Sequence, residues 1–259
     1  MTAEKVDDNT HFGSRTVRTG EKPQLVRSIF DDVADRYDLM NDLMSVGIHR
    51  LWKLAMIDWL APRSGAHYLD VAGGTGDIAL RILNRLAAGD KQNTEGTRIT
   101  VVDASGSMLQ TGRDRAVDAG ILNPIEWVHG DAECLPIDNQ SIDFFTIAFG
   151  IRNVARIDTT LAEAQRVLKP GGRFLCLEFS HVLLPILSSA YDAYSFRLLP
   201  ALGEFITGNR EAYQYLAESI RRFPHQEEFA AMIGDAGLGQ VKVRNLSGGI
   251  AALHSAWRI

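Results

Sequence analysis

From residue 68 onward, short apolar runs alternate with segments in which apolar residues recur at helical spacing. The first run, Tyr68–Ala72, ends at glycines, and the residues that follow carry an apolar helix face made of Ala79, Ile82, Leu83 and Leu86. Further runs of the same kind are Ile99–Asp103, Ile125–His129, Ile142–Phe149 and Gly172–Phe179. Strands that alternate with helices form a parallel sheet covered on both faces. The pattern therefore predicts a doubly wound α/β fold.

The N-terminal part of the chain departs from this alternation. Residues 1–22 are polar and are expected to form a loose arm. Two helical patterns follow, one made of Phe30, Val33, Ala34 and Tyr37, the other of Trp52, Met56, Trp59 and Leu60 ahead of Pro62. We therefore predict an arm and helical cap over residues 1–62 and a main domain over residues 63–259.

The C-terminal part departs from it too. Val241–Arg244 and Ile250–Trp257 flank Ser247-Gly248-Gly249, which is typical of two antiparallel strands with a tight connection. A helix stopped by Gly237 precedes them. These features predict a mostly parallel seven-stranded sheet with an antiparallel C-terminal strand. Residues 181–223 form an apolar, aromatic insertion with helical character.

Composition narrows the classes of function. The formal net charge is −5, which argues against a broad electrostatic grip on nucleic acid. The two cysteines, Cys134 and Cys176, lie far apart, and the seven histidines show no metal-ligand spacing, so we expect no disulfide framework and no catalytic metal. No stretch approaches the ~20 apolar residues that span a bilayer, and residues 1–10 resemble neither a signal nor a transit peptide. The expected location is the cytoplasm, in solution or at the inner membrane surface, or the mitochondrial matrix if a transit peptide has been removed.

The sharpest motif is the glycine turn Asp70–Asp77, which lies where the first predicted strand ends and a helix begins. Glycines there allow a sharp turn and a close approach of ligand to backbone, as Gly74 and Gly76 would in a nucleotide site, although a plain structural turn has the same pattern. Asp103 ends the second strand, where a carboxylate accepts ribose hydroxyls, and Asp131 follows the third, where it can accept from the adenine amine. A helix cap or turn aspartate is the alternative for each. Together these strand ends predict an adenosine site.

Two cofactors contain adenosine and suit such a site, namely NAD(P) and S-adenosylmethionine. A pyrophosphate needs a helix N-terminus free of negative charge, but Asp77 occupies that first turn and Asp70 precedes the glycines. Both acids favour a sulfonium and an ammonium group instead. The charges, and the antiparallel C-terminal pair, favour S-adenosylmethionine.

Several stretches of the chain resemble one known family, the ubiquinone/menaquinone biosynthesis C-methyltransferases. The most specific is Tyr37–Trp52; the others are Thr10–Gly13, Phe149–Val154, Arg166–Phe174 leading into Leu177–Ser180, Tyr191–Phe196 and Tyr215–Ile220. The resemblance covers nearly the whole chain from about residue 10. Some members carry Ser where this chain has Ala148, so any donor contact there is limited to the main chain, and the polar loop 88–98 is longer than in compact bacterial members.

The resemblance implies a class I methyltransferase that uses S-adenosylmethionine to methylate a ring carbon of a prenylated benzoquinol or naphthoquinol. By position, Thr75, Asp103, Asp131 and Ala132 are implied contacts of the cofactor. The resemblance implies a prenylated quinol as substrate, and the further partners that we expect are a membrane surface and either a quinone-biosynthesis complex or a second copy of the chain.

Candidate catalytic residues lie after the fourth strand, in the cap and in the insertion. Arg152 would hold a phenolate oxygen as a fixed positive charge, with a structural salt bridge as the alternative, and Asn153 beside it would contact substrate. His49 is the titrating candidate in the cap, although a lone histidine is more often structural. Tyr194 and Asp192 either orient a second hydroxyl or pack within the insertion.

The apolar stripe that begins at Val182 and Leu183 and runs to Leu199 suits an isoprenoid tail or a membrane surface, and equally a core beneath a helical lid. Three functions stay open from the residues. The first is quinol C-methylation. The second is methylation of another small phenol or a sterol, and the third is a catalytically silent scaffold of a quinone-synthesis complex.

Overall fold

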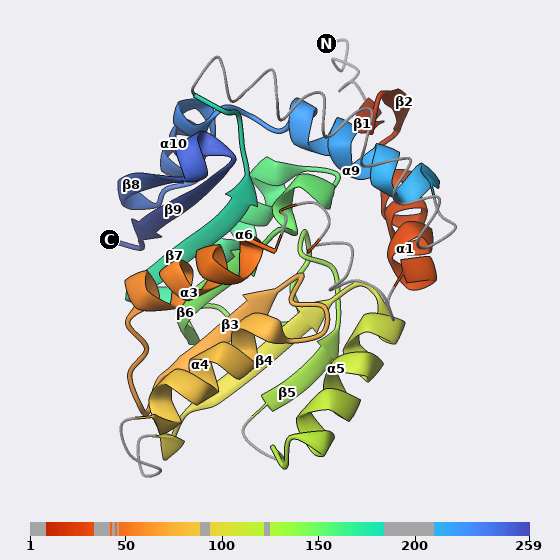
Figure 1. Cartoon of the computed structure of the whole chain (residues 1–259). Helices are drawn as coiled ribbons and strands as arrows, with labels where there is room; N and C mark the ends of the chain where they lie inside the picture. The colour runs from red at the N-terminus through yellow and green to blue at the C-terminus, as the bar shows by residue number, and fades with distance from the viewer. Residues whose placement is uncertain are drawn as a thin grey trace, which may run out of the picture.

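The computed structural model describes residues 9–33, 42, 45, 47–88, 94–121, 125–183 and 210–259. A seven-stranded sheet forms its centre, with the strand order β5-β4-β3-β6-β7-β9-β8 (Figure 1). All neighbouring strands are parallel except β9, which is antiparallel to both β7 and β8. The predicted doubly wound α/β fold with an antiparallel C-terminal strand is confirmed. The strands are β3 His67–Val71, β4 Arg98–Asp103, β5 Ile125–His129, β6 Ile142–Ala148, β7 Leu168–Phe179, β8 Gly239–Leu246 and β9 Ala251–Trp257.

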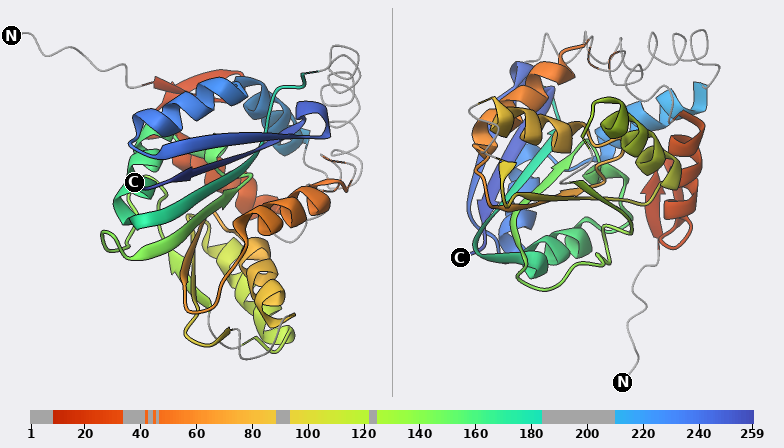
Figure 2. Two further views of the ribbon diagram at one scale, coloured as in Figure 1. Left: turned by 90° about the vertical axis from the view of Figure 1, so that its left-hand side faces the viewer. Right: turned by 90° about the horizontal axis from the view of Figure 1, so that it is seen from below.

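Helices cover both faces of this sheet (Figure 2). On one face lie α3 His49–Leu60, α4 Asp77–Ala87 and α5 Gly106–Asp118; on the other lie α6 Ile157–Val167 and α10 Gln226–Asp235. Short 3-10 turns, η3 Ile151–Asn153 and η5 Ser247–Gly249, follow β6 and connect β8 to β9. Ser105 caps the N-terminus of α5, because its hydroxyl accepts a hydrogen bond from the Met108 N–H at 3.2 Å.

The strand sequences build two cores because successive side chains point to opposite faces of a sheet. Tyr68 and Val101 belong to the core that includes α3 and α4, whereas their neighbours Leu69 and Val102 belong to the core that includes α6 and α10. All four side chains are fully buried. Since both faces are covered, these strands read as continuous apolar runs and not as alternating ones.

The predicted loose arm is wrong for residues 9–18. They form a hairpin of β1 Asn9–Phe12 and β2 Arg15–Arg18, and α1 Lys22–Val33 follows it. The hairpin packs through β1 against α9 Arg210–Arg222. The Phe12 ring stacks on Tyr215 with centroids 4.5 Å apart, and the Ser14 N–H donates to the Glu218 carboxylate at 2.6 Å. A two-stranded hairpin is marginal alone, so contacts some 200 residues away in sequence supply its stability. No local pattern predicts them.

Parts of the predicted cap and insertion lie outside the described residues. These include Ala34, Tyr37 and residues 184–209, and with them Asp192 and Tyr194. Within the insertion, α9 confirms the helical character of its C-terminal part. Of the two described N-terminal helices, α3 packs on α4 and β7, while α1 lies beside β1 and α5 (Figure 1). No helix in the described part of the chain is both long and apolar enough to cross a membrane.

Candidate functional site

A cavity opens at the carboxyl ends of β3, β4, β5 and β6, where the strand order reverses between β3 and β6. Ligands of open α/β sheets bind at such a switch point. Most residues predicted for the cofactor line this cavity; they are Asp70, Gly74, Thr75, Asp103, Asp131 and Ala132. Ala148 and Asn153 line it as well. The four strand ends therefore meet at one site, as the parallel topology requires.

The glycine turn is held by Asp103. The Gly74 N–H donates to one Asp103 carboxylate oxygen at 2.8 Å, and the Ser105 N–H donates to the other at 2.8 Å. Gly74 has φ +53° and Gly76 has φ +74°, a left-handed conformation that favours glycine. A carboxylate has about four lone-pair positions, so Asp103 keeps acceptor capacity toward the cavity.

Gly76 does not line the cavity, although it was predicted to bind cofactor. It lies at the start of α4, and a Cβ there would stand 2.4 Å from the Trp127 ring. Its place in the structure is therefore to let the turn pack against β5. A direct cofactor contact by Gly76 stays a prediction.

Asp70 is fully buried, and only one of its two carboxylate oxygens has a hydrogen-bond partner in the described part of the chain. Its Oδ1 accepts a hydrogen bond from the Thr146 hydroxyl at 2.9 Å, whereas Oδ2 has no hydrogen-bond partner in the described part of the chain. Burial raises the pKa of Asp70 to about 7, and the Thr146 hydrogen bond opposes that shift. A buried carboxylate oxygen without a donor fits a cationic ligand group, because that group would supply the missing partner.

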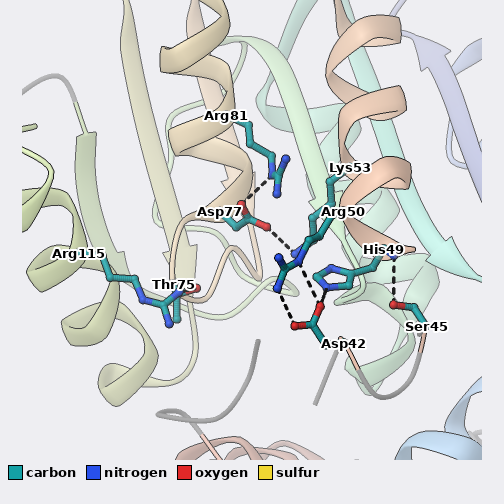
Figure 3. A network of polar contacts seen from close by, with 9 residues as sticks. All are labelled: Asp42, Ser45, His49, Arg50, Lys53, Thr75, Asp77, Arg81 and Arg115. Carbon is teal, nitrogen blue, oxygen red and sulfur yellow. Dashed lines mark hydrogen bonds and ion pairs between the residues drawn. The ribbon is translucent and has the colours of Figure 1, made fainter. Parts of the chain in front are cut away.

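Asp131 and Thr75 already have protein partners. Asp131 is exposed, and its Oδ1 accepts from the Glu133 N–H at 2.9 Å, so it does form the turn that was its alternative role. The buried Thr75 hydroxyl accepts from Arg115 at 3.2 Å (Figure 3). Ligand contacts by these two residues stay predictions, although both line the cavity.

Lys53 is a cavity residue that sequence reasoning missed. It lies on α3 with only 3% of its surface exposed, and its Nζ donates to Asp77 Oδ2 at 2.6 Å (Figure 3). Asp77 also accepts from Arg81 at 2.7 Å. Burial alone would raise the pKa of Asp77, but Lys53 and Arg81 hold it below its ordinary value. The sequence did contain a signal for Lys53, because it is a charged residue on the same helix face as the buried Trp52 and Met56.

His49 lies at the start of α3 and does not line the cavity. Its Nε2 contacts Asp42 Oδ1 at 2.8 Å, and its backbone N–H donates to the Ser45 hydroxyl at 3.1 Å (Figure 3). Burial lowers the pKa of His49, although Asp42 opposes that shift. The imidazole Nδ1 has no hydrogen-bond partner in the described structure. A role in substrate chemistry stays a prediction.

Arg152 forms a buried ion pair with Glu178, with 2.7 Å between Nη1 and Oε1 and side chains that are 2% and 1% exposed. It lines a second pocket, which shares Val154 and Ala155 with the first. Burial raises the pKa of Glu178 while the Arg152 charge opposes that shift. Arg152 therefore forms the structural salt bridge that was its alternative role. A further role of Arg152 toward substrate stays a prediction.

Asn153 faces the first cavity from η3, and Tyr215 of α9 positions it. The Tyr215 hydroxyl donates to Asn153 Oδ1 at 3.1 Å, and burial raises the pKa of Tyr215 well above its ordinary value, so it remains a donor. Glu178 and Tyr215 were not predicted as partners of this segment. Glu178 lies 26 residues from Arg152 in sequence and Tyr215 lies 62 from Asn153, so no local pattern pairs them.

No cluster of three or more His, Cys, Asp or Glu side chains that could hold a metal ion occurs among the described residues. The chemistry of the cavity lies instead in carboxylates, a buried ammonium and backbone N–H groups. These residues fit a ligand that contains adenosine and a positive charge.

Comparison with known proteins decides which ligand that is. The model of the ubiE/COQ5 methyltransferase family matches residues 18–258. The chain belongs to this family. A relative from Paracoccus denitrificans, named ubiquinone/menaquinone biosynthesis C-methyltransferase UbiE, is 56% identical over 250 residues, covering 96% of this chain and 97% of the relative. One of the same name from Cereibacter sphaeroides is 54% identical over 257 residues, covering 99% and 100%.

Solved structures share the fold at low identity. A SAM-dependent methyltransferase from Thermotoga maritima gives a TM-score of 0.64 at 18% identity, covering 90% of this chain and 100% of that one. Phosphoethanolamine N-methyltransferase 2 from Haemonchus contortus, in complex with S-adenosyl-L-methionine, gives 0.55 at 16%, covering 80% and 52%. The predicted family, the methyltransferase activity and S-adenosylmethionine as the donor are confirmed.

Proposed function

We propose that this methyltransferase methylates a ring carbon of a prenylated quinol, either the benzoquinol of ubiquinone synthesis, demethylmenaquinol, or both. The observation that carries the proposal is the 56% and 54% identity, over nearly the full length, to relatives whose names state this activity. Methylation of another small phenol or a sterol is the alternative, and the methyltransferase activity of the family argues against the silent scaffold.

The reaction joins a weak carbon nucleophile to a donor that, when bound, supplies an electrophilic methyl group. The chain must therefore orient the ring, assist loss of a hydroxyl proton and exclude water. Ala148, Phe149 and Gly150 provide an apolar wall where β6 ends, and Asn153 places a polar amide beside it. Because Tyr215 fixes Asn153 Oδ1, we propose that the Asn153 amide group orients a quinol hydroxyl.

Arg152 is proposed to act as a fixed charge. A guanidinium does not give up its proton near neutral pH, so Arg152 stabilises a phenolate and does not act as the base. Its ion pair with Glu178 fixes the guanidinium within η3, next to Asn153. His49, Tyr194 and Asp192 remain candidates for the base and for the second hydroxyl.

Transfer of a tritiated methyl group tests the substrate. The purified protein is given labelled S-adenosylmethionine with short-tailed demethylated benzoquinol or demethylmenaquinol, and donor binding is measured in parallel. We expect label in at least one quinol. Donor binding without transfer to either quinol would overturn the quinol as the substrate, and a parallel assay with a sterol and a simple phenol would then test the alternative.

We also propose that the enzyme works at a membrane surface, where prenyl tails partition. Leu51 and Leu54 on α3 are 64% and 42% exposed, and Ile48 and Leu183 are exposed as well. Full burial of a fully exposed leucine is favourable by roughly 1.5–3 kcal/mol, and burial of these partly exposed side chains is favourable by a fraction of that. The location that follows is the cytoplasmic membrane surface, or the matrix side in a mitochondrion.

Liposome flotation tests this contact. The native protein is expected to float with vesicles that contain quinol, and a Leu51→Ser, Leu54→Ser double variant is expected to stay at the bottom with unchanged donor affinity. Sedimentation of both proteins without lipid shows whether the same leucines instead bury a second copy. Flotation that is equal for both proteins would exclude α3 as the contact.

A further inference from the structure

The donor cavity contains a buried cation, although its ligand carries two positive groups that a cation would repel. The sulfonium and ammonium groups of S-adenosylmethionine are both positive, yet Lys53 places an ammonium among the lining residues with 3% exposure. A buried charge is retained only when it is paired, because leaving water is costly. Asp77 pairs with it at 2.6 Å.

Asp77 does not balance the charge around it. Its other oxygen accepts from Arg81 at 2.7 Å, so one carboxylate serves two cations (Figure 3). The cluster of Lys53, Asp77 and Arg81 therefore carries one surplus positive charge. Arg81 does not line the cavity, whereas Lys53 does, so the surplus is available to an anion at Lys53.

The donor has one anionic group, the carboxylate of its methionine end. Asp103 and Asp131 stand at the ends of β4 and β5, where the adenosine is expected, and they offer no positive charge. On the other side of the glycine turn lies Asp70, whose Oδ2 is buried without a hydrogen-bond partner in the described structure. Lys53, Asp70 and Asp77 all line this same cavity.

We propose that Lys53 binds the carboxylate of the donor's methionine end while Asp70 accepts from its ammonium group. Asp77 holds the Lys53 ammonium in place from the start of α4. The pair of buried opposite charges matches an α-amino acid zwitterion, so Lys53 selects donors that retain their carboxylate. This inference rests on S-adenosylmethionine as the donor and does not depend on which quinol is methylated.

Calorimetry with two ligands tests the contact without an activity assay. A Lys53→Met variant keeps the apolar stem and removes the charge. We expect it to bind S-adenosylmethionine roughly ten- to a hundredfold more weakly, which is the loss of one charge-assisted hydrogen bond. For decarboxylated S-adenosylmethionine we expect the native protein and the variant to agree within about threefold.

Arg81→Met is the matched control, because Arg81 shares Asp77 but does not line the cavity. Its affinity for both ligands is expected to stay near native. A Lys53→Met loss that is equal for both ligands would reduce Lys53 to a structural role. Unchanged affinity for S-adenosylmethionine together with lost turnover on quinol would assign Lys53 to the substrate and overturn the proposal.

If Lys53→Met does not fold, the proposal is tested with the native protein and with Lys53→Arg. The native protein must bind decarboxylated donor at least about tenfold more weakly than S-adenosylmethionine, and Lys53→Arg must retain part of that preference. Equal binding of the two ligands by the native protein overturns the proposal. Absence of any S-adenosylmethionine binding by the native protein would instead overturn the donor site itself.

Discussion

Arg152→Met is expected to lower the free energy of unfolding by about 3–5 kcal/mol. The substitution removes the guanidinium of η3 that pairs with Glu178 of β7. The Glu178 carboxylate, which is 1% exposed, is then left without a cationic partner. Glu178 would retain the Phe179 N–H at 2.9 Å, which does not replace a full charge. Chemical denaturation with a linear extrapolation measures the loss.

The double variant Arg152→Met, Glu178→Gln separates structure from catalysis. It removes both charges, and the amide oxygen of the introduced glutamine still accepts from the Phe179 N–H, so most of the lost stability is expected to return. Donor affinity is expected to stay within about threefold of native, while turnover on quinol falls by about a hundredfold or more, the usual loss when a charge that stabilises the transition state is removed. Native stability combined with native turnover in the double variant would make Arg152 a structural residue only.

Asp103→Ala is expected to weaken donor binding by about 1.5–3 kcal/mol, or roughly ten- to a hundredfold. The change removes the predicted ribose acceptor and also the acceptor that holds the Gly74 and Ser105 N–H groups at 2.8 Å. The glycine turn then loses the side chain that fixes it. Calorimetry with S-adenosylmethionine measures the change.

Two comparisons show how much of the lost donor affinity comes from the ribose contact and how much comes from the glycine turn. Asp103→Asn keeps one acceptor oxygen for the turn and is expected to lose less affinity than Asp103→Ala. A donor analogue without ribose hydroxyls should show a smaller loss on Asp103→Ala than the natural donor does. Unchanged affinity of Asp103→Ala would refute the ribose contact.

The fold could be predicted from the sequence because its signals are local. The runs at Tyr68, Ile99 and Ile142 are each a few residues long, and burial on both faces of the sheet requires each to be mostly apolar. Chain topology then brings the ends of parallel strands to one edge. The sequence for that reason predicts that Asp70, Asp103 and Asp131 meet at one cavity, and they do.

The partners of the functional groups were decided by the tertiary structure. Lys53 meets Asp77 across two helices, Arg152 meets Glu178 across two strand ends, and Tyr215 reaches Asn153 from a helix 62 residues away in sequence. The hairpin at residues 9–18 likewise depends on α9. Periodicity reports which side of an element is buried, but it carries no information about which charge lies opposite.

The alternation of strands and helices, the glycine turn and the three acids at strand ends follow from residue type and spacing alone. The charge balance of the donor cavity, and whether Arg152 has a partner, depend on side chains that only the folded chain brings within about 3 Å of each other. The reason is physical: backbone preference and hydrophobic period act between near neighbours, whereas ion pairs and hydrogen bonds form wherever the packed elements place their ends.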